Sequence, residues 1–223
     1  MTPLLALALW GWCVIVTVDL VSAPQGLLAR PVVAASVAGL LAGNLAAGLL
    51  VGVALELYAL DVLPIGAARY PDYGAAAASA AAAAALVPEA PALALAGLIG
   101  LPLAILGGWT LHVHRRRSAE SIHRRLERVT AGEARAIWEL QRNGLIRDAG
   151  RGVVLGAIGL SAIVAAGAFP WSAFPRMELV GAATVAGGLA AALGGALRSG
   201  GQGARRRWLA VGMATGLLLV LSR

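Results

Sequence analysis

Several side chains in the first third of the chain can form hydrogen bonds or carry charge, although they lie among alanine, leucine, valine and glycine. These polar positions are Asp19, Gln25, Arg30, Asn44, Glu56, Asp61, Arg69 and Asp72. Carboxylates and amides can make several hydrogen bonds at once, so such groups can hold a polar ligand where water is excluded. An ionisable side chain at membrane depth is energetically costly, which favours a binding site or transport path. The alternative is that the carboxylates pair structurally with Arg30 and Arg69.

Glycines and prolines accompany these polar groups. Gly39 with Gly43, and Gly48 with Gly52, have the small-xxx-small spacing that lets helix backbones approach closely. In a discontinuous helix the freed backbone groups must line a cavity or be satisfied by neighbouring groups. The pattern therefore predicts broken or re-entrant helices, with helix packing alone as the other interpretation of the glycines.

The elements that position these groups are apolar helices. The 223-residue chain is 59% apolar and 13% charged, whereas soluble domains average about 45–50% and about 25%, so a soluble core could not bury it. The apolar residues form seven blocks: 3–18, 32–55, 74–87, 91–111, 152–169, 179–197 and 208–222. A helical span needs roughly 17–25 apolar residues. The blocks expected to cross the bilayer alone are 32–55, 91–111, 152–169 and 179–197.

The remaining blocks are shorter. The alanine-rich run 74–87 ends at Pro88 and is predicted to be a half-helix, and the runs 3–18 and 208–222 are marginal in length. The predicted fold class is all-α, a polytopic helical membrane protein with roughly six to eight membrane segments, not all of them full crossings. A cleavable signal peptide is disfavoured because no basic residue precedes the first apolar run and Asp19 interrupts the approach to its end.

Charge is concentrated in the middle of the chain. Every basic residue is an arginine, and ten of the eighteen lie between Arg115 and Arg151 with five acidic residues among them. Apolar residues recur there at helical spacing, which predicts an amphipathic helix lying on the membrane surface. By the positive-inside rule, residues 115–151, Arg198 and 205–207 are expected to be cytoplasmic. The interleaved acids and flanking spans disfavour nucleic-acid binding.

Composition thus divides the chain into three regions. Residues 1–111 form an N-terminal membrane region with the candidate site, residues 112–151 a cytoplasmic arginine-rich connection, and residues 152–223 the C-terminal membrane spans. The three histidines lie at the start of the connection, and no cysteine or carboxylate at useful spacing completes a metal site with them. No cofactor is expected.

The order of short motifs in the first region is distinctive. Between about residues 10 and 80 the chain carries, in order, Arg30-Pro31, the two glycine pairs, Leu55-Glu56, Ile65-Gly66-Ala67-Ala68 and Pro71-Asp72. This string resembles the IIC membrane subunit of mannose/fructose/sorbose-type sugar phosphotransferase system (PTS) permeases. The chain departs from that family at Asn44, where the family usually has an aspartate.

The resemblance implies a multi-pass transport subunit of the cell (inner) membrane that binds and translocates a hexose or related sugar. Such a subunit is not itself an enzyme, because a phosphohistidine on a separate IIB subunit, charged by IIA, phosphorylates the sugar. The implied partners are the sugar, a second membrane subunit IID, the cytoplasmic IIB and IIA subunits and membrane lipid, in an oligomer without nucleic acid. The alternative is a membrane scaffold or regulatory subunit that kept the fold and lost transport.

Sugar hydroxyls both donate and accept hydrogen bonds, which suits carboxylate and amide side chains. The residues predicted to bind the sugar are Gln25, Asn44, Glu56 and Asp72. Glu56 is the leading candidate because it interrupts an otherwise apolar run. Arg30, Pro31 and Pro71 are expected to balance charge or fix turns.

Overall fold

A computed structural model describes residues 1–61, 70–199 and 207. In these residues all regular structure is helical. The elements, in order, are α1 (Pro3–Val21), α2 (Pro31–Leu41), α3 (Leu45–Ala59), α4 (Tyr73–Leu86), α5 (Ala92–Leu95), a π-helical turn η1 (Ala96–Gly100), α6 (Leu101–His123), α7 (Leu126–Thr130), α8 (Ala134–Ala168), a 3-10 turn η2 (Trp171–Ala173) and α9 (Met177–Ser199). The all-α fold class is confirmed.

The helices fall into a long class and a short class. Within the part of the chain that the structure describes, four apolar helical segments are long enough to cross a membrane: Pro3–Val21, Ala92–His123, Ala134–Ala168 and Met177–Gly195. Three apolar helices are shorter: α2, α3 and α4. This mixture confirms a polytopic membrane protein with broken helices. The apolar run 208–222 lies outside the described residues.

The prediction that residues 32–55 form one span is wrong, because the chain turns back in the middle of this run. Gly43 has a φ of +84°, and the amide of Asn44 donates to the carbonyl of Gly39 at 2.8 Å, which is a Schellman ending for α2. The Asn44 side chain then accepts from the amide of Ala47 at 3.0 Å and starts α3. Helices of 11 and 15 residues rise about 16 and 22 Å, less than the ~30 Å of a bilayer core.

The glycine pairs allow α2 and α3 to lie directly against each other. A Cβ on Gly39 would stand 2.7 Å from the Cα of Gly48, and one on Gly48 would stand 2.6 Å from the carbonyl oxygen of Ala35. Such distances leave no room for a methyl group. The packing interpretation therefore holds for these two glycines, which close the hairpin of α2 and α3.

Helix α4 runs through the centre of the molecule, where it contacts α1, α2, α3, α6 and α8. It is 14 residues long and almost entirely alanine, and its residues from Gly74 to Ala84 are buried. Alanine is the strongest helix former, and its small side chain lets these neighbouring helices approach one axis. The predicted half-helix at 74–87 is thus a short, buried helix that begins after Asp72 and ends before Pro88.

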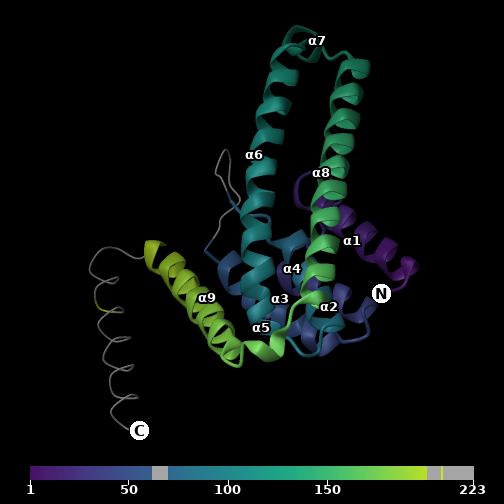
Figure 1. Cartoon of the computed structure of the whole chain (residues 1–223). Coiled ribbons are helices and arrows are strands. Elements are labelled where there is room, and N and C mark those ends of the chain that lie inside the picture. The colour runs from purple at the N-terminus through teal and green to yellow at the C-terminus, as the bar shows by residue number, and fades with distance from the viewer. Residues whose placement is uncertain (62–69, 200–206, 208–223) are drawn as a thin grey trace.

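The arginine-rich segment forms a projecting hairpin, which corrects the prediction of a helix lying flat on the membrane surface. Figure 1 shows α6 and α8 continuing side by side beyond the other helices, joined at the tip by α7. The α8 residues before the apolar part, 134–151, rise about 27 Å. Near the tip Arg128 donates from Nε to Glu133 at 2.6 Å, and this hydrogen bond lowers the pKa of Glu133.

This hairpin gives the topology a direct test. We expect a single cysteine at Ala131, in the hairpin tip, to resist a membrane-impermeant thiol reagent in intact cells, because the positive-inside rule places these arginines in the cytoplasm. A cysteine at Ser172 should be labelled, since the turn between α8 and α9 lies at the opposite end of the molecule (Figure 1). Both variants need a Cys13→Ser background. The reverse labelling pattern would contradict this orientation.

Candidate functional site

Four helix ends meet at one cavity of about 440 Å³. Helix α1 ends there at Val21 and α3 at Ala59, while α2 begins there at Pro31 and α4 at Tyr73. Arg115 of α6 completes the wall. Small-molecule pockets occupy roughly 300–1,000 Å³, so the cavity has room for a small polar ligand.

The start of α2 is held by Glu56, which lies in the last turns of α3. One carboxylate oxygen accepts from the amide of Val32 at 3.1 Å, and the other forms an ion pair with the Arg30 guanidinium. The first amides of a helix have no partner within the helix and favour a negative charge. Glu56 therefore caps a broken helix and fixes Arg30 on the cavity wall.

The connection between α1 and α2 is held by Asp19. Its two oxygens accept from the amides of Gly26 at 2.7 Å and Ala29 at 2.9 Å. This loop has two non-glycine residues in the left-handed region, Gln25 with φ +56° and Leu27 with φ +70°. Each such residue costs about 1–3 kcal/mol and persists only where surrounding contacts impose it. The buried Asp19 carboxylate supplies those contacts.

The start of α4 is held by a buried ion pair. Asp72 is fully buried and accepts from the amide of Ala75 at 3.4 Å. Arg151 of α8 donates from Nη1 to Asp72 at 2.6 Å and from Nη2 to the carbonyl oxygen of Thr17 at 3.2 Å. One guanidinium thus joins α1, α4 and α8.

A second buried carboxylate, Asp148, connects the loop to the base of the hairpin. It accepts a hydrogen bond from the Ser22 hydroxyl. His114 Nε2 lies 3.4 Å and Arg151 Nε 3.7 Å from the other carboxylate oxygen. The positions of the loop, α6 and α8 are therefore coupled by one polar cluster beside the cavity.

The cavity itself is lined by groups of mixed hydrogen-bonding character. The polar residues on its wall are Asp19, Gln25, Arg30, Tyr70, Tyr73 and Arg115. Arg115 donates from Nη2 to the Tyr70 hydroxyl at 2.6 Å, and its guanidinium lies 4.7 Å from the centre of that ring. Gln25 donates to the carbonyl of Val21 at 2.7 Å, which leaves its amide oxygen as an acceptor. The wall can both donate and accept hydrogen bonds.

The structure brings only some of the sequence-predicted residues to this cavity. Gln25, Arg30, Pro31 and Pro71 line it. Glu56 and Asp72 are not among the lining residues, and the described groups around them engage their oxygens. Asn44 lies at the opposite end of α3, about 22 Å away along the helix axis. The stretch 63–66, expected to bring Glu56 and Asp72 together, lies outside the described residues.

Sequence reasoning missed several residues that build the site. Asp19 was recognised as a polar group but not assigned to the site, and Tyr70 was not singled out. Arg115 and Arg151 stand at the two ends of the arginine-rich segment, directly beside apolar spans. That position at the membrane boundary was the signal that separates them from the exposed arginines of the hairpin.

Comparison with known proteins gives the family. The family model described as "PTS system sorbose-specific iic component" matches residues 2–218. No curated protein shows significant similarity to the chain. A solved structure titled "Structure of membrane protein" is 20% identical and superposes with a TM-score of 0.68, covering 100% of this chain and 92% of that chain. At this identity the likeness concerns the fold.

The buried ion pair predicts a distinctive pattern of stabilities. Asp72→Asn keeps a capping oxygen but leaves Asp148, 3.7 Å from Nε, as the carboxylate nearest to the Arg151 guanidinium, and Arg151→Met strands the Asp72 charge. Each is expected to destabilise the protein by about 3–5 kcal/mol. The double variant should lose clearly less stability than the sum of the two single losses, because neither charge of the Asp72–Arg151 pair is left without the other, and Asp148 keeps its contacts with Ser22 and His114. Thermal unfolding of the purified variants measures this coupling.

An exposed pair on the hairpin supplies the control. Arg135 and Glu139 lie 3.3 Å apart, with the arginine side chain 82% exposed. Glu139→Gln should change stability by less than about 1 kcal/mol. Additive losses for Asp72→Asn and Arg151→Met, or losses no larger than that of Glu139→Gln, would contradict the role given to the buried pair.

Proposed function

We propose that this chain, which belongs to the family of PTS sorbose-specific IIC components, binds a hexose or related sugar in the cavity formed by one end each of α1, α2, α3 and α4. Membership of that family makes the chain a membrane transport subunit of a sugar PTS. The observation that carries this proposal is the convergence of broken helix ends on a cavity of about 440 Å³. Discontinuous membrane helices are characteristic of transporter binding sites.

The chemistry of the wall suits a sugar. A sugar ring carries hydroxyls that donate and accept, and Gln25, Tyr70 and Arg115 offer both kinds of partner. The tyrosine rings present apolar faces beside polar tips. In this proposal Gln25 contacts the sugar. Glu56 supports sugar binding by holding Arg30 on the cavity wall, and Asp72 supports it by holding the start of α4, where Tyr73 lies. Asn44 is left out because it lies at the far end of α3.

The cavity opens on the side of the arginine-rich hairpin, since Arg115 belongs both to its wall and to the start of that segment. With the arginines in the cytoplasm, this is the conformation that releases sugar inward. Phosphorylation would follow there, on a cytoplasmic IIB subunit that IIA charges, and IID would complete the membrane complex. This chain supplies the sugar site and no phosphohistidine.

Substitutions of Gln25, on the wall, and of Glu56, which holds Arg30 on the wall, test the site. Gln25→Ala should weaken sugar binding roughly two- to 150-fold, because one or two hydrogen bonds of about 0.5–1.5 kcal/mol each are lost. Glu56→Gln should weaken it about tenfold, since Arg30 loses its ion-pair partner. Binding of sorbose, fructose and mannose by the chain purified with its IID partner provides the measurement.

Asn44→Asp is the matched control, because it keeps the cap of α3 and changes a polar side chain away from the cavity. It should leave sugar affinity unchanged. Thermal unfolding of every variant shows whether the protein remains folded. Folded Gln25→Ala and Glu56→Gln proteins with unchanged affinity would exclude this cavity as the sugar site. A folded wild-type complex that binds none of the three sugars would favour the scaffold alternative.

A further inference from the structure

A second hollow, the α6–α8 groove, lies on the outside of the helix pair at the base of the hairpin. It has a volume of about 460 Å³, and one part of its lining is apolar while the other is basic. Trp109, Val113 and Val154 form its apolar part, while Arg117 and Arg147 form its basic part. His114 and Arg151 close its inner wall, and these two residues belong to the polar cluster around Asp148 and Asp72.

The two outer arginines differ from the inner one. Arg151 is paired with Asp72, and its side chain is only 4% exposed. For Arg117 and Arg147, no carboxylate among the described residues lies within ion-pair distance. A guanidinium has five N–H donors in a planar fork and binds phosphate in a bidentate manner. Two such groups facing one groove form a site for an anionic phosphate.

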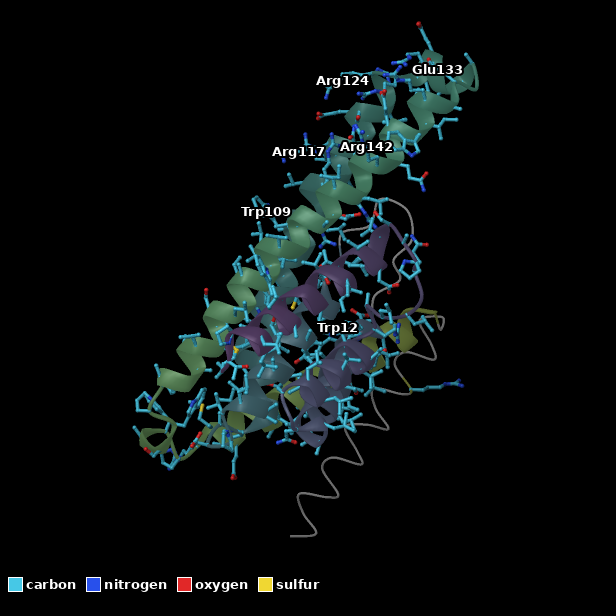
Figure 2. The ribbon with its side chains drawn as sticks, turned by 90° about the vertical axis from the view of Figure 1, so that its right-hand side faces the viewer. Trp12, Trp109, Arg117, Arg124, Glu133 and Arg142 are labelled. Atoms are coloured by element: carbon cyan, nitrogen blue, oxygen red, sulfur yellow. The ribbon has the colours of Figure 1, made fainter. Side chains whose placement is uncertain are left out.

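The groove lies where the helices change from apolar to polar. Val154 is 53% exposed on the apolar part of α8, and Trp109 is 64% exposed on α6. Exposed tryptophan is typical of the boundary between hydrocarbon and headgroups. Arg117 lies eight residues, or about 12 Å, further along α6, and Figure 2 shows Trp109 and Arg117 projecting from the same side of the hairpin.

We propose that this groove binds an anionic phospholipid. The phosphate is held by Arg117 and Arg147, and an acyl chain lies along Trp109, Val113 and Val154. A free phosphate would use only the basic end, whereas a phospholipid uses both ends. Basic pockets between membrane helices on the cytoplasmic side commonly take such headgroups. The bound lipid would brace α6 against α8 beside the polar cluster, and this inference does not depend on which ligand occupies the cavity.

The test compares lipids on the purified full chain by native mass spectrometry. Phosphatidylglycerol should bind at least about fivefold more tightly than phosphatidylcholine with the same acyl chains. The double variant Arg117→Gln with Arg147→Gln should bind phosphatidylglycerol about tenfold more weakly or worse. The control pair, Arg116→Gln with Arg124→Gln, removes the same charge from an exposed position of α6 and from the exposed residue that follows the helix, both outside the groove, and should change binding less than about twofold.

A steric variant distinguishes binding of the whole phospholipid from binding of its headgroup alone. Val154→Trp should weaken phosphatidylglycerol binding by obstructing the apolar end, with both arginines retained. Equal affinity for the two lipids, or equal losses in the two double variants, would overturn the proposal. So would inorganic phosphate that stabilises the protein against heat as much as phosphatidylglycerol does at the same ionic strength, because the groove would then be a phosphate site alone.

Discussion

A helix that stops inside a membrane protein leaves backbone amides that neither lipid nor bulk water can satisfy, and the rest of this structure depends on how those amides are met. Among the described residues, two carboxylates accept hydrogen bonds from such helix-end amides, and a third accepts from amides of the adjoining loop. Glu56 accepts from the start of α2, Asp72 from the start of α4, and Asp19 from the loop before α2. The negative charges at membrane depth therefore have a structural cause before they have a functional one.

Each buried carboxylate in turn requires a positive partner or several donors, and this requirement fixes distant parts of the chain. Asp72 forms an ion pair with Arg151 of α8 in the interior, and Glu56 forms one with Arg30 at the cavity wall. Asp148 couples the loop at Ser22 to His114 in α6. The base of the hairpin is thus anchored to the helix ends that surround the cavity. A change in that anchoring would alter the cavity, which is the kind of coupling a transport cycle requires.

The sequence predicted the class of fold well because composition and apolar run lengths report directly on a bilayer. It also predicted broken or re-entrant helices in the first half of the chain. The single span over 32–55 failed because hydropathy does not register a turn, although Gly43 followed by Asn44 is a typical helix end and helix start. The pairing of Asp72 with Arg151 could not be predicted, because 79 residues separate the two partners. The prediction of a helix lying flat on the membrane surface was wrong, because a helical period of apolar residues does not distinguish a surface helix from two helices packed against each other.

The central claim is that sugar binds among the helix ends that the buried carboxylates hold. Cryo-electron microscopy of the chain with its IID partner and bound sugar tests this most directly. The account predicts sugar density inside the cavity, within hydrogen-bond distance of Gln25 and beside Tyr70 and Arg115. Sugar density at the α2–α3 turn beside Asn44, or anywhere outside the ring of helix ends, would contradict it.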